Sequence, residues 1–374
     1  MKLTNLALIL ILSTQLLNGW SDNRFSCDSK KDVEFNSNWK DFLEESEDAI
    51  ETFNDLQNYE ESWFSFIHSK QDVQDDFNEI LEDMIGTFTN NKKIIFCLNK
   101  MKEFNRDIIT IQNEILLLKE KDENSSKVVI KNIKVKNQHI TKLQNHIKES
   151  KKSILNELKK LGLDISDSEL NTLLVRIDSQ NIIQMMLVFD ISKKITAKLE
   201  KLILSGNGDV KIIKRYYGMN IILSEIALFI QNQYIRSIDS NFIPKLKNMI
   251  VDISTLKQKT MTLLKHSLTG YEKSIYTNNI QSQDLTIKTA KIYIKNLNTQ
   301  QKQILLAKKQ VLRNLDLTLN SYQTMAVSSN LISLINLSNK NFTKIMTMQF
   351  PEIIPFTNQN MEKEYIKLTE KLNR

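Results

Sequence analysis

The amino-acid sequence predicts an all-α fold, an elongated helical bundle with a long antiparallel coiled-coil stalk. Glycine and proline are scarce, with seven and three residues in a chain of 374, so turns must be few and the elements between them long. Apolar residues recur at helical spacing, and in two stretches they follow the seven-residue repeat of a coiled coil. A content of 41% hydrophobic and 25% charged residues excludes a chain that is disordered by composition.

Residues 1–20 predict an export signal. A positively charged start is followed by an apolar stretch from Leu6 to Leu17 and by the small residue Gly19. This order is typical of a secretory signal peptide, although the apolar stretch alone would also suit a buried helix. We therefore expect cleavage between about Gly19 and Asp22, and a mature protein that is secreted or periplasmic.

Residues 21–90 predict an acidic arm of two short amphipathic helices. They contain 19 acidic and 5 basic residues, a net charge of −14, whereas the chain from residue 91 onward carries +20. Such an arm suits pairing within the molecule, a charged partner or an anionic surface. The apolar face of the first helix consists of Trp39, Phe42, Leu43, Ile50, Phe53 and Leu56. That of the second helix consists of Trp63, Phe64, Phe66, Phe77, Ile80, Leu81 and Met84.

Residues 91–162 predict a coiled-coil hairpin. Apolar residues alternate at spacings of three and four in its first half and recur every seven residues in its second half. Each helix therefore presents one apolar stripe to the other, and the polar stretch 121–126 is expected to form the turn between antiparallel helices. The stripes consist of Ile94, Cys97, Met101, Phe104, Ile108, Ile111, Ile115 and Leu118, and of Ile133, Ile140, Ile147, Ile154 and Leu161.

Residues 163–240 predict a central pair of helices that begins at a capping box formed by Ser166 and Glu169. The two helices are joined at 205–209 and hold the most apolar runs of the mature chain. Polar residues interrupt each run before it reaches the roughly 18 apolar residues of a membrane-spanning helix. The pair therefore fits either the core of a helical bundle or a conditionally exposed hairpin tip that contacts a membrane or a partner helix.

Residues 241–374 predict long return helices and a short C-terminal helix. The stretch at 239–244 is interpreted as a stop, or as a kink with a fresh helical start, because it ends in proline. A heptad-like apolar stripe then extends to Gly270, and a further long helix is expected from about Gln283 to Met348.

The chain contains two cysteines, Cys27 and Cys97. In an exported protein they could form a disulfide that ties the N-terminal arm to the first helix of the coiled coil. Cys97 also fits the apolar stripe of that helix as a small hydrophobic residue. The sequence leaves both alternatives open.

The sequence contains no pattern that predicts a reaction. A glycine-rich phosphate loop, a nucleophile elbow and a zinc-binding His-Glu-x-x-His pair are all absent from it. His139 and His146 share a helix face, but seven residues of helix separate them by about 10 Å, too far to share one metal ion. We therefore expect no enzymatic activity, no cofactor, no metal ion, no small-molecule substrate and no nucleic-acid partner.

Several short motifs between about residue 170 and the C-terminus resemble the B subunits of alpha-xenorhabdolysin-type binary toxins. The motifs are Arg215-Tyr216-Tyr217-Gly218-Met219, Tyr234-Ile235, Ile243-Pro244-Lys245-Leu246, Pro351-Glu352-Ile353-Ile354-Pro355-Phe356, Glu364-Tyr365 and Leu368-Thr369. In that family two elongated helical proteins assemble into a membrane pore. The resemblance implies a component of a two-component α-helical pore-forming toxin, or cytolysin, and the export signal predicts that this one is secreted. The resemblance also implies a second helical subunit as partner in a hetero-oligomer and contact with a lipid membrane on assembly.

Two functions therefore remain to be weighed. For the toxin, the residues expected to contact a membrane or a partner are Met185, Leu187, Val188, Phe189, Tyr216, Tyr217, Ile222, Leu228 and Phe229. The alternative is an exported coiled-coil scaffold or adaptor of the bacterial cell envelope, which needs only the apolar stripes and the export signal. In that alternative the same residues are helix-packing core.

Overall fold

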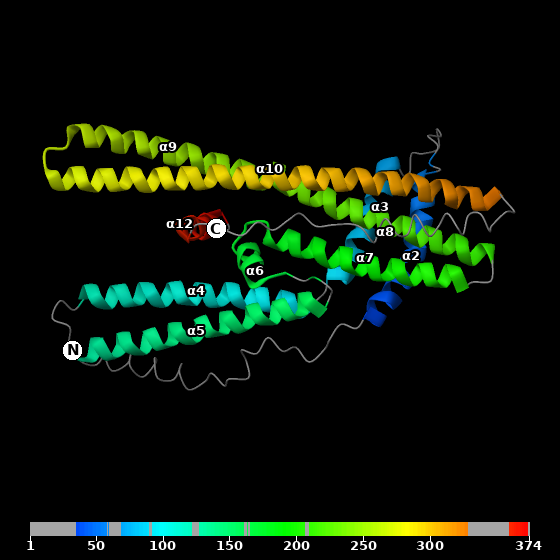
Figure 1. The fold of residues 1–374 in the computed structure, drawn as a ribbon, viewed down its shortest axis with the longest axis horizontal. Coiled ribbons are helices and arrows are strands. Elements are labelled where there is room, and N and C mark those ends of the chain that lie inside the picture. The colour runs from blue at the N-terminus through cyan, green and yellow to red at the C-terminus, as the bar shows by residue number, and fades with distance from the viewer. Residues whose placement is uncertain are drawn as a thin grey trace. The chain divides into compact units, whose positions relative to one another are not determined.

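The computed structural model describes residues 35–57, 59, 69–89, 92–121, 127–160, 163, 165–205, 209–327 and 359–372 (Figure 1). Every regular element in these ranges is a helix and none is a strand, so the predicted all-α fold is confirmed. The described helices belong to two compact units, of which one contains α4 and α5 and the other contains the remaining helices.

The first unit is the predicted coiled-coil hairpin. Helices α4 (Lys92–Lys121) and α5 (Lys127–Lys160) pack against each other along their length. Their shared core is formed by Phe104, Ile111, Ile115 and Leu143, with Ile108, Ile133, Ile140 and Ile147 packed against it. All of these residues except Leu143 belong to the two predicted stripes, so the sequence identified most of the contact surface of the two helices. The turn at 122–126 lies outside the described residues.

The second unit begins with the acidic arm. Helices α2 (Phe35–Gln57) and α3 (Lys70–Thr89) pack against each other, and both also contact α7 and α8. Their apolar faces point inward, because the buried residues Phe42 and Phe53 of α2 and Phe77 and Leu81 of α3 recur at helical spacing. The expected apolar residues Trp63, Phe64 and Phe66 lie outside the described residues.

The central helices begin at the predicted capping box. Ser166 Oγ accepts a hydrogen bond from the Glu169 backbone N–H, while the Ser166 backbone N–H donates to the Glu169 carboxylate at 2.7 Å. This box starts the short helix α6 (Asp167–Leu174), which is followed by α7 (Ser179–Ser205) and α8 (Val210–Ser237). Asp209 caps α8 by accepting from two backbone N–H groups, those of Lys211 and Ile212.

The chain stays helical after α8, so the stretch 239–244 is not a stop. One π-helical turn, η2 (Ile238–Phe242), leads directly into α9 (Ile243–His266), and Pro244 lies at the start of α9. Proline fits there because its missing N–H and its ring disturb a helix least in the first turn.

Helix α10 (Gly270–Val327) begins earlier than expected, and the prediction of a start near Gln283 is wrong. A second capping box explains the early start. The backbone N–H of Glu272 donates to Thr269 Oγ1 at 3.1 Å, and the Glu272 carboxylate accepts from the backbone N–H groups of Leu268 and Thr269. The expected continuation of this helix to Met348 lies beyond the described residues.

The return helices pack as long antiparallel partners. Helix α10 contacts α9 and α8 in turn, so the segment from α8 through α9 runs back along α10 (Figure 1). The expected short C-terminal helix is α12 (Gln359–Leu372), which also packs on α10. Helix α8 of the second unit therefore lies between α10 and the α2–α3 pair, while α7 packs on α8, α2 and α3.

Candidate functional site

Most of the residues expected to contact a membrane or a partner are buried in this structure. In α7, Met185, Leu187, Val188 and Phe189 expose at most 2% of their surface; in α8, Tyr217 and Ile222 expose 0% and Leu228 exposes 6%. Tyr216 and Phe229 are partly exposed. In this conformation the α7–α8 pair is helix-packing core, and its contact with a membrane or partner stays a prediction.

The α2–α3 pair, named the acidic cover here, packs over α7 and α8. The ring of Trp39 lies 4.1 Å from Lys198 Nζ of α7, and Glu47 forms an ion pair with Arg215 of α8. The cover carries 13 acidic and 2 basic residues, a net charge of −11, whereas α7 and α8 together carry 8 basic and 3 acidic residues, or +5. Hydrophobic packing and complementary charge both favour this contact.

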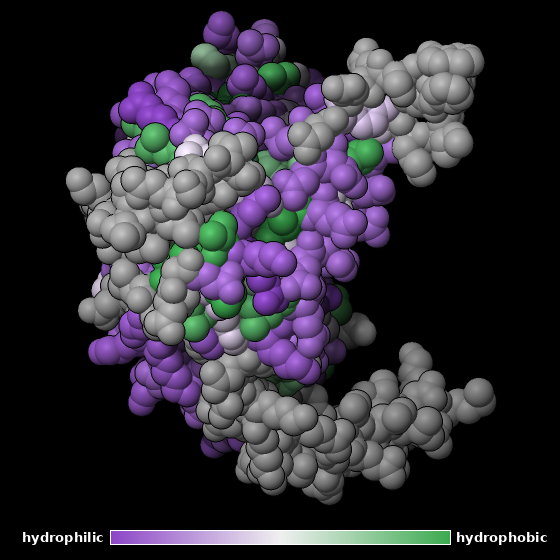
Figure 2. Space-filling model, turned by 90° about the vertical axis from the view of Figure 1, so that its right-hand side faces the viewer, coloured by the Kyte–Doolittle hydropathy of each residue, from purple (hydrophilic) through white to green (hydrophobic). Residues whose placement is uncertain are grey.

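The face of the molecule drawn in Figure 2 carries little continuous hydrophobic area among its coloured residues. Over the residues drawn in colour in Figure 2, hydrophilic surface predominates and hydrophobic surface forms small separate areas. Most apolar side chains of α7 and α8 are held inside the unit. They could reach a bilayer only after the helices that pack on them have moved.

The core between these helices also contains unsatisfied polar groups. Within the described part of the chain, Ser192 Oγ and Thr196 Oγ1 of α7 and Asn220 Oδ1 and Gln231 Oε1 of α8 are buried without a hydrogen-bond partner. The spacing i, i+4 places Ser192 and Thr196 on one face of α7, and a spacing of eleven does the same for the α8 pair. Each helix therefore carries a polar stripe inside an otherwise apolar environment.

Two acidic residues of the α7–α8 pair have raised pKa values. Burial raises the pKa of Glu225 on α8 to about 7. Burial also raises the pKa of Asp190 on α7, although Lys194 Nζ lies 2.7 Å from its carboxylate and opposes the shift. The folded conformation thus disfavours the charged form of both carboxyl groups, because each has lost contact with water.

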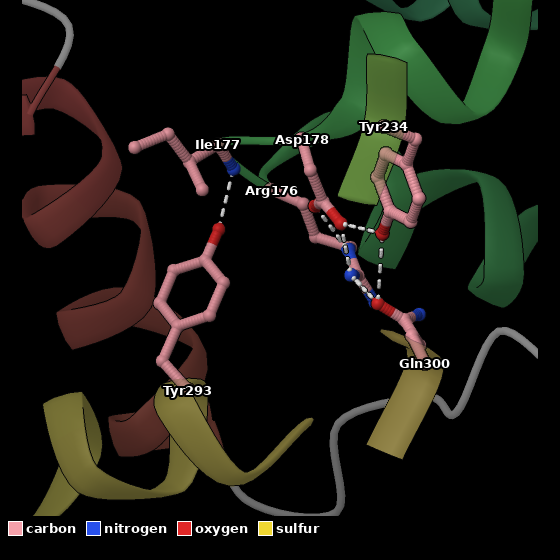
Figure 3. A network of polar contacts seen from close by, with 6 residues as sticks. All are labelled: Arg176, Ile177, Asp178, Tyr234, Tyr293 and Gln300. Atoms are coloured by element: carbon pink, nitrogen blue, oxygen red, sulfur yellow. Dashed lines mark hydrogen bonds and ion pairs between the residues drawn. The ribbon is translucent and has the colours of Figure 1, made fainter. Parts of the chain in front are cut away.

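A buried ion pair fixes the start of α7. Arg176 and Asp178 lie in the turn between α6 and α7, and the guanidinium donates to the two carboxylate oxygens at 2.8 and 2.5 Å (Figure 3). The same guanidinium donates to Gln300 of α10, and the hydroxyl of Tyr234 on α8 donates to Asp178 at 2.6 Å. The turn is therefore bound to both long helices that pack beside it.

The surroundings of this network keep Arg176 protonated and Tyr234 neutral. Burial by itself disfavours the charge on Arg176, but the Asp178 carboxylate outweighs it and raises the pKa of the guanidinium, which stays protonated. Burial and the Asp178 charge raise the pKa of Tyr234, which therefore stays a neutral hydrogen-bond donor. The positive and negative charges compensate each other, so the arrangement suits a structural role.

Two tyrosines extend the network to the C-terminal helix. The backbone N–H of Ile177 donates to the Tyr293 hydroxyl, and the Tyr293 ring stacks on Tyr365 of α12 with centroids 3.7 Å apart. Burial raises the pKa of both tyrosine hydroxyls. One buried cluster thus connects the α6–α7 turn with α8, α10 and α12.

Sequence reasoning did not find this cluster. A signal was present, because Arg176 and Asp178 are two charged residues within the apolar segment around Val175 and Ile177, and charges in such a segment need a buried partner. The distant partners Tyr234 and Gln300 carry no local signal that would connect them with the turn.

The cysteine pair, metal sites and membrane spans can be compared with the structure only for the described residues. Cys97 is buried in α4, whereas Cys27 lies outside the described residues, so their disulfide stays a prediction. In the described ranges, His, Cys, Asp and Glu form no group of three or more that could hold a metal ion. Nor does any helix in those ranges combine the length and the apolar character that crossing a membrane requires.

Comparison with known proteins adds no assignment. No protein-family model, no curated protein and no solved structure matches this chain.

Proposed function

We propose that this chain is a non-enzymatic component of a secreted two-component α-helical pore-forming toxin, which binds a second helical subunit and a lipid membrane. The observation that carries the proposal is the α7–α8 pair, whose apolar helices contain unsatisfied polar stripes and lie beneath an acidic two-helix cover. On assembly the cover moves away, and the α7–α8 pair enters the bilayer beside neighbouring subunits.

The polar stripes favour this role over a permanent core. A buried polar group without a partner costs about 1–3 kcal/mol, so four such groups weaken the packed state of α7 and α8. Neither helix is apolar enough to cross a membrane by itself. In a ring of subunits, however, the stripes can face a water-filled lumen while the apolar faces contact lipid. Helices of 27 and 28 residues are about 40 Å long, which exceeds the roughly 30 Å of a hydrocarbon core.

The charge of the cover suggests how the pair is released. Lys198 of α7 and Arg215 of α8 contact a cover of net charge −11. An anionic lipid surface competes for the same basic residues, because each lysine or arginine close to it contributes about 1 kcal/mol of attraction. The bilayer and the partner subunit together would then displace the cover.

A reversible disulfide between the cover and α8 tests the proposal. A Cβ built on Gly218 would lie 3.2 Å from Ile50 Cγ1, which places the two Cβ atoms roughly 4 Å apart, within the range of disulfides. The double variant Ile50→Cys and Gly218→Cys is made with Cys27→Ser and Cys97→Ala. Dye leakage from vesicles is then measured together with the helical protein encoded by a neighbouring gene.

We expect leakage from the reduced double variant and none from the oxidised one, because the disulfide keeps the cover on α8. Each single-cysteine variant, oxidised in the same way, is the matched control and should leak in both states. Leakage that persists in the oxidised double variant contradicts release of the cover. An absence of leakage from the unmodified chain with every neighbouring helical protein contradicts the toxin itself.

The exported envelope scaffold or adaptor remains the second candidate, and the burial of seven of the nine expected contact residues favours it. A scaffold keeps α7 and α8 packed at all times. It predicts that the mature chain stays soluble beside vesicles with and without the neighbouring protein, and that the disulfide between positions 50 and 218 changes none of its interactions.

A further inference from the structure

The connection between α9 and α10 exposes apolar side chains to an unusual degree. Leu268 in the turn is 93% exposed, and Tyr271 in the first turn of α10 is 77% exposed. Their neighbours Leu263, Met261 and Ile275 are 52%, 44% and 38% exposed. Single exposed apolar residues are common on protein surfaces, whereas five within fifteen consecutive residues at one end of a helical hairpin indicate a contact site.

This end of the hairpin, residues 257–275, is an ordered structure. Glu272 accepts hydrogen bonds from the backbone N–H groups of Leu268 and Thr269 at 2.9 and 3.1 Å and thereby fixes the turn. Ser267 Oγ donates to the Leu264 carbonyl at 2.7 Å and closes the last turn of α9. These hydrogen bonds hold the turn in a geometry that exposes Leu268 and Tyr271 to the solvent.

The charge around these residues is positive. Residues 257–275 contain four lysines and one glutamate, a net charge of +3, and the glutamate is the one that caps the turn. Lys257 pairs with Asp284 at 2.5 Å, whereas Lys259, Lys265 and Lys273 are exposed. The apolar side chains therefore lie within a group of exposed cations.

We propose that the α9–α10 hairpin end is a docking surface for an anionic lipid bilayer. Leu268 and Tyr271 enter the boundary between headgroups and acyl chains, where an aliphatic side chain and an amphipathic ring are both favourable. The three exposed lysines contact the acidic headgroups, since their charge is complementary and their long side chains can reach the interface. The segment lies at the surface of the bilayer and does not cross it.

This inference rests on the proposed membrane function only in that the protein meets a bilayer. It concerns residues outside the α7–α8 pair and requires no pore and no movement of the cover. Its test therefore measures binding of the chain alone to the vesicle surface. A negative result in that test can be told apart from an absence of leakage.

The test uses the mature chain with Cys27→Ser and Cys97→Ala and one new cysteine that carries an environment-sensitive fluorophore. The label is placed at Leu268, or, as a matched control, at Leu306, which is 63% exposed in the middle of α10. We expect a blue shift at position 268 with phosphatidylcholine vesicles that contain about 30% phosphatidylserine, and none at position 306. Raising the salt from about 0.1 to about 0.5 M should weaken the shift at position 268.

Flotation of unlabelled variants gives a second measurement. Leu268→Glu with Tyr271→Glu should bind the same vesicles about tenfold more weakly or worse, while Leu306→Glu with Leu317→Glu, equally charged and also exposed, should bind normally. Equal shifts at positions 268 and 306 would overturn the proposal. So would a shift that is as strong with pure phosphatidylcholine, or one that appears only when the neighbouring protein is added without vesicles.

Discussion

Gly218 of α8 lies so close to Ile50 of α2 that a Cβ at position 218 would come within 2.8 Å of Ile50 Cδ1. Only glycine lets the acidic cover approach α8 to this distance, because any larger residue would meet the Ile50 side chain. The contact joins two segments that are far apart in the sequence. It also shows that α2 and α8 pack closely at this point.

The substitution Gly218→Ala should loosen this contact. We expect a loss of about 1 kcal/mol of unfolding free energy, because Ile50 must shift although alanine is the better helix former. Ile50→Val removes the nearest atom, so combining it with Gly218→Ala should cost less than the two single changes added together. Urea unfolding of the four proteins measures this coupling, and strictly additive effects would contradict the proposed contact.

The ion pair in the α6–α7 turn should be sensitive to loss of one partner. Arg176→Met leaves the Asp178 carboxylate buried without its countercharge, which should cost about 3–5 kcal/mol in urea unfolding. Arg176→Lys should recover only part of this, because lysine cannot make the two-pronged contact. Removing the exposed charge in Arg236→Met is the control and should change stability by less than about 0.5 kcal/mol.

Glu225 should make stability depend on pH. Burial raises its pKa to about 7 in the folded chain, while the unfolded chain keeps a value near 4.3, so the folded state binds the proton more tightly. The penalty is complete above about pH 7 and disappears below the unfolded pKa. Glu225→Gln should therefore stabilise the protein at about pH 8, by up to about 3 kcal/mol, and hardly at all near pH 4.5.

Urea midpoints of the Glu225→Gln variant and the unmodified protein at several pH values measure this difference. Glu51→Gln, at an exposed position of α2, controls for the substitution itself. A gain that is the same at all pH values would show that the carboxyl of Glu225 does not titrate in this range.

The coiled-coil hairpin should depend on its central leucine. Leu143 of α5 is fully buried in the shared core, so Leu143→Ala should destabilise the hairpin by about 2–5 kcal/mol through the cavity it leaves. Leu116→Ala removes the same side chain at a position of α4 that is 56% exposed and should cost much less. Thermal unfolding followed by circular dichroism compares the two variants, and equal losses would contradict the assigned seam.

The sequence by itself determined the features that repeat or act over a few residues. The heptad stripes of α4 and α5 predicted which faces meet, because a 3.5-residue period keeps one stripe on one side of a helix. Ser166 and Glu169 predicted the start of α6, because a capping box is complete within four residues. The box of Thr269 and Glu272 carried the same signal for α10, and there the prediction instead followed the apolar stripe.

Only the tertiary structure decided what the helices pack against. Periodicity showed that α7 and α8 are apolar, but their burial depends on distant segments: α2 and α3 end at Gln57 and Thr89, long before α7 begins at Ser179, and α10 follows α8 and packs on it. The network of Arg176, Asp178, Tyr234 and Gln300 likewise joins residues up to 124 positions apart. Local spacing determines which face of a helix is apolar and becomes buried. Which other helices bury that face depends on complementary shape and charge between segments that only the fold brings together.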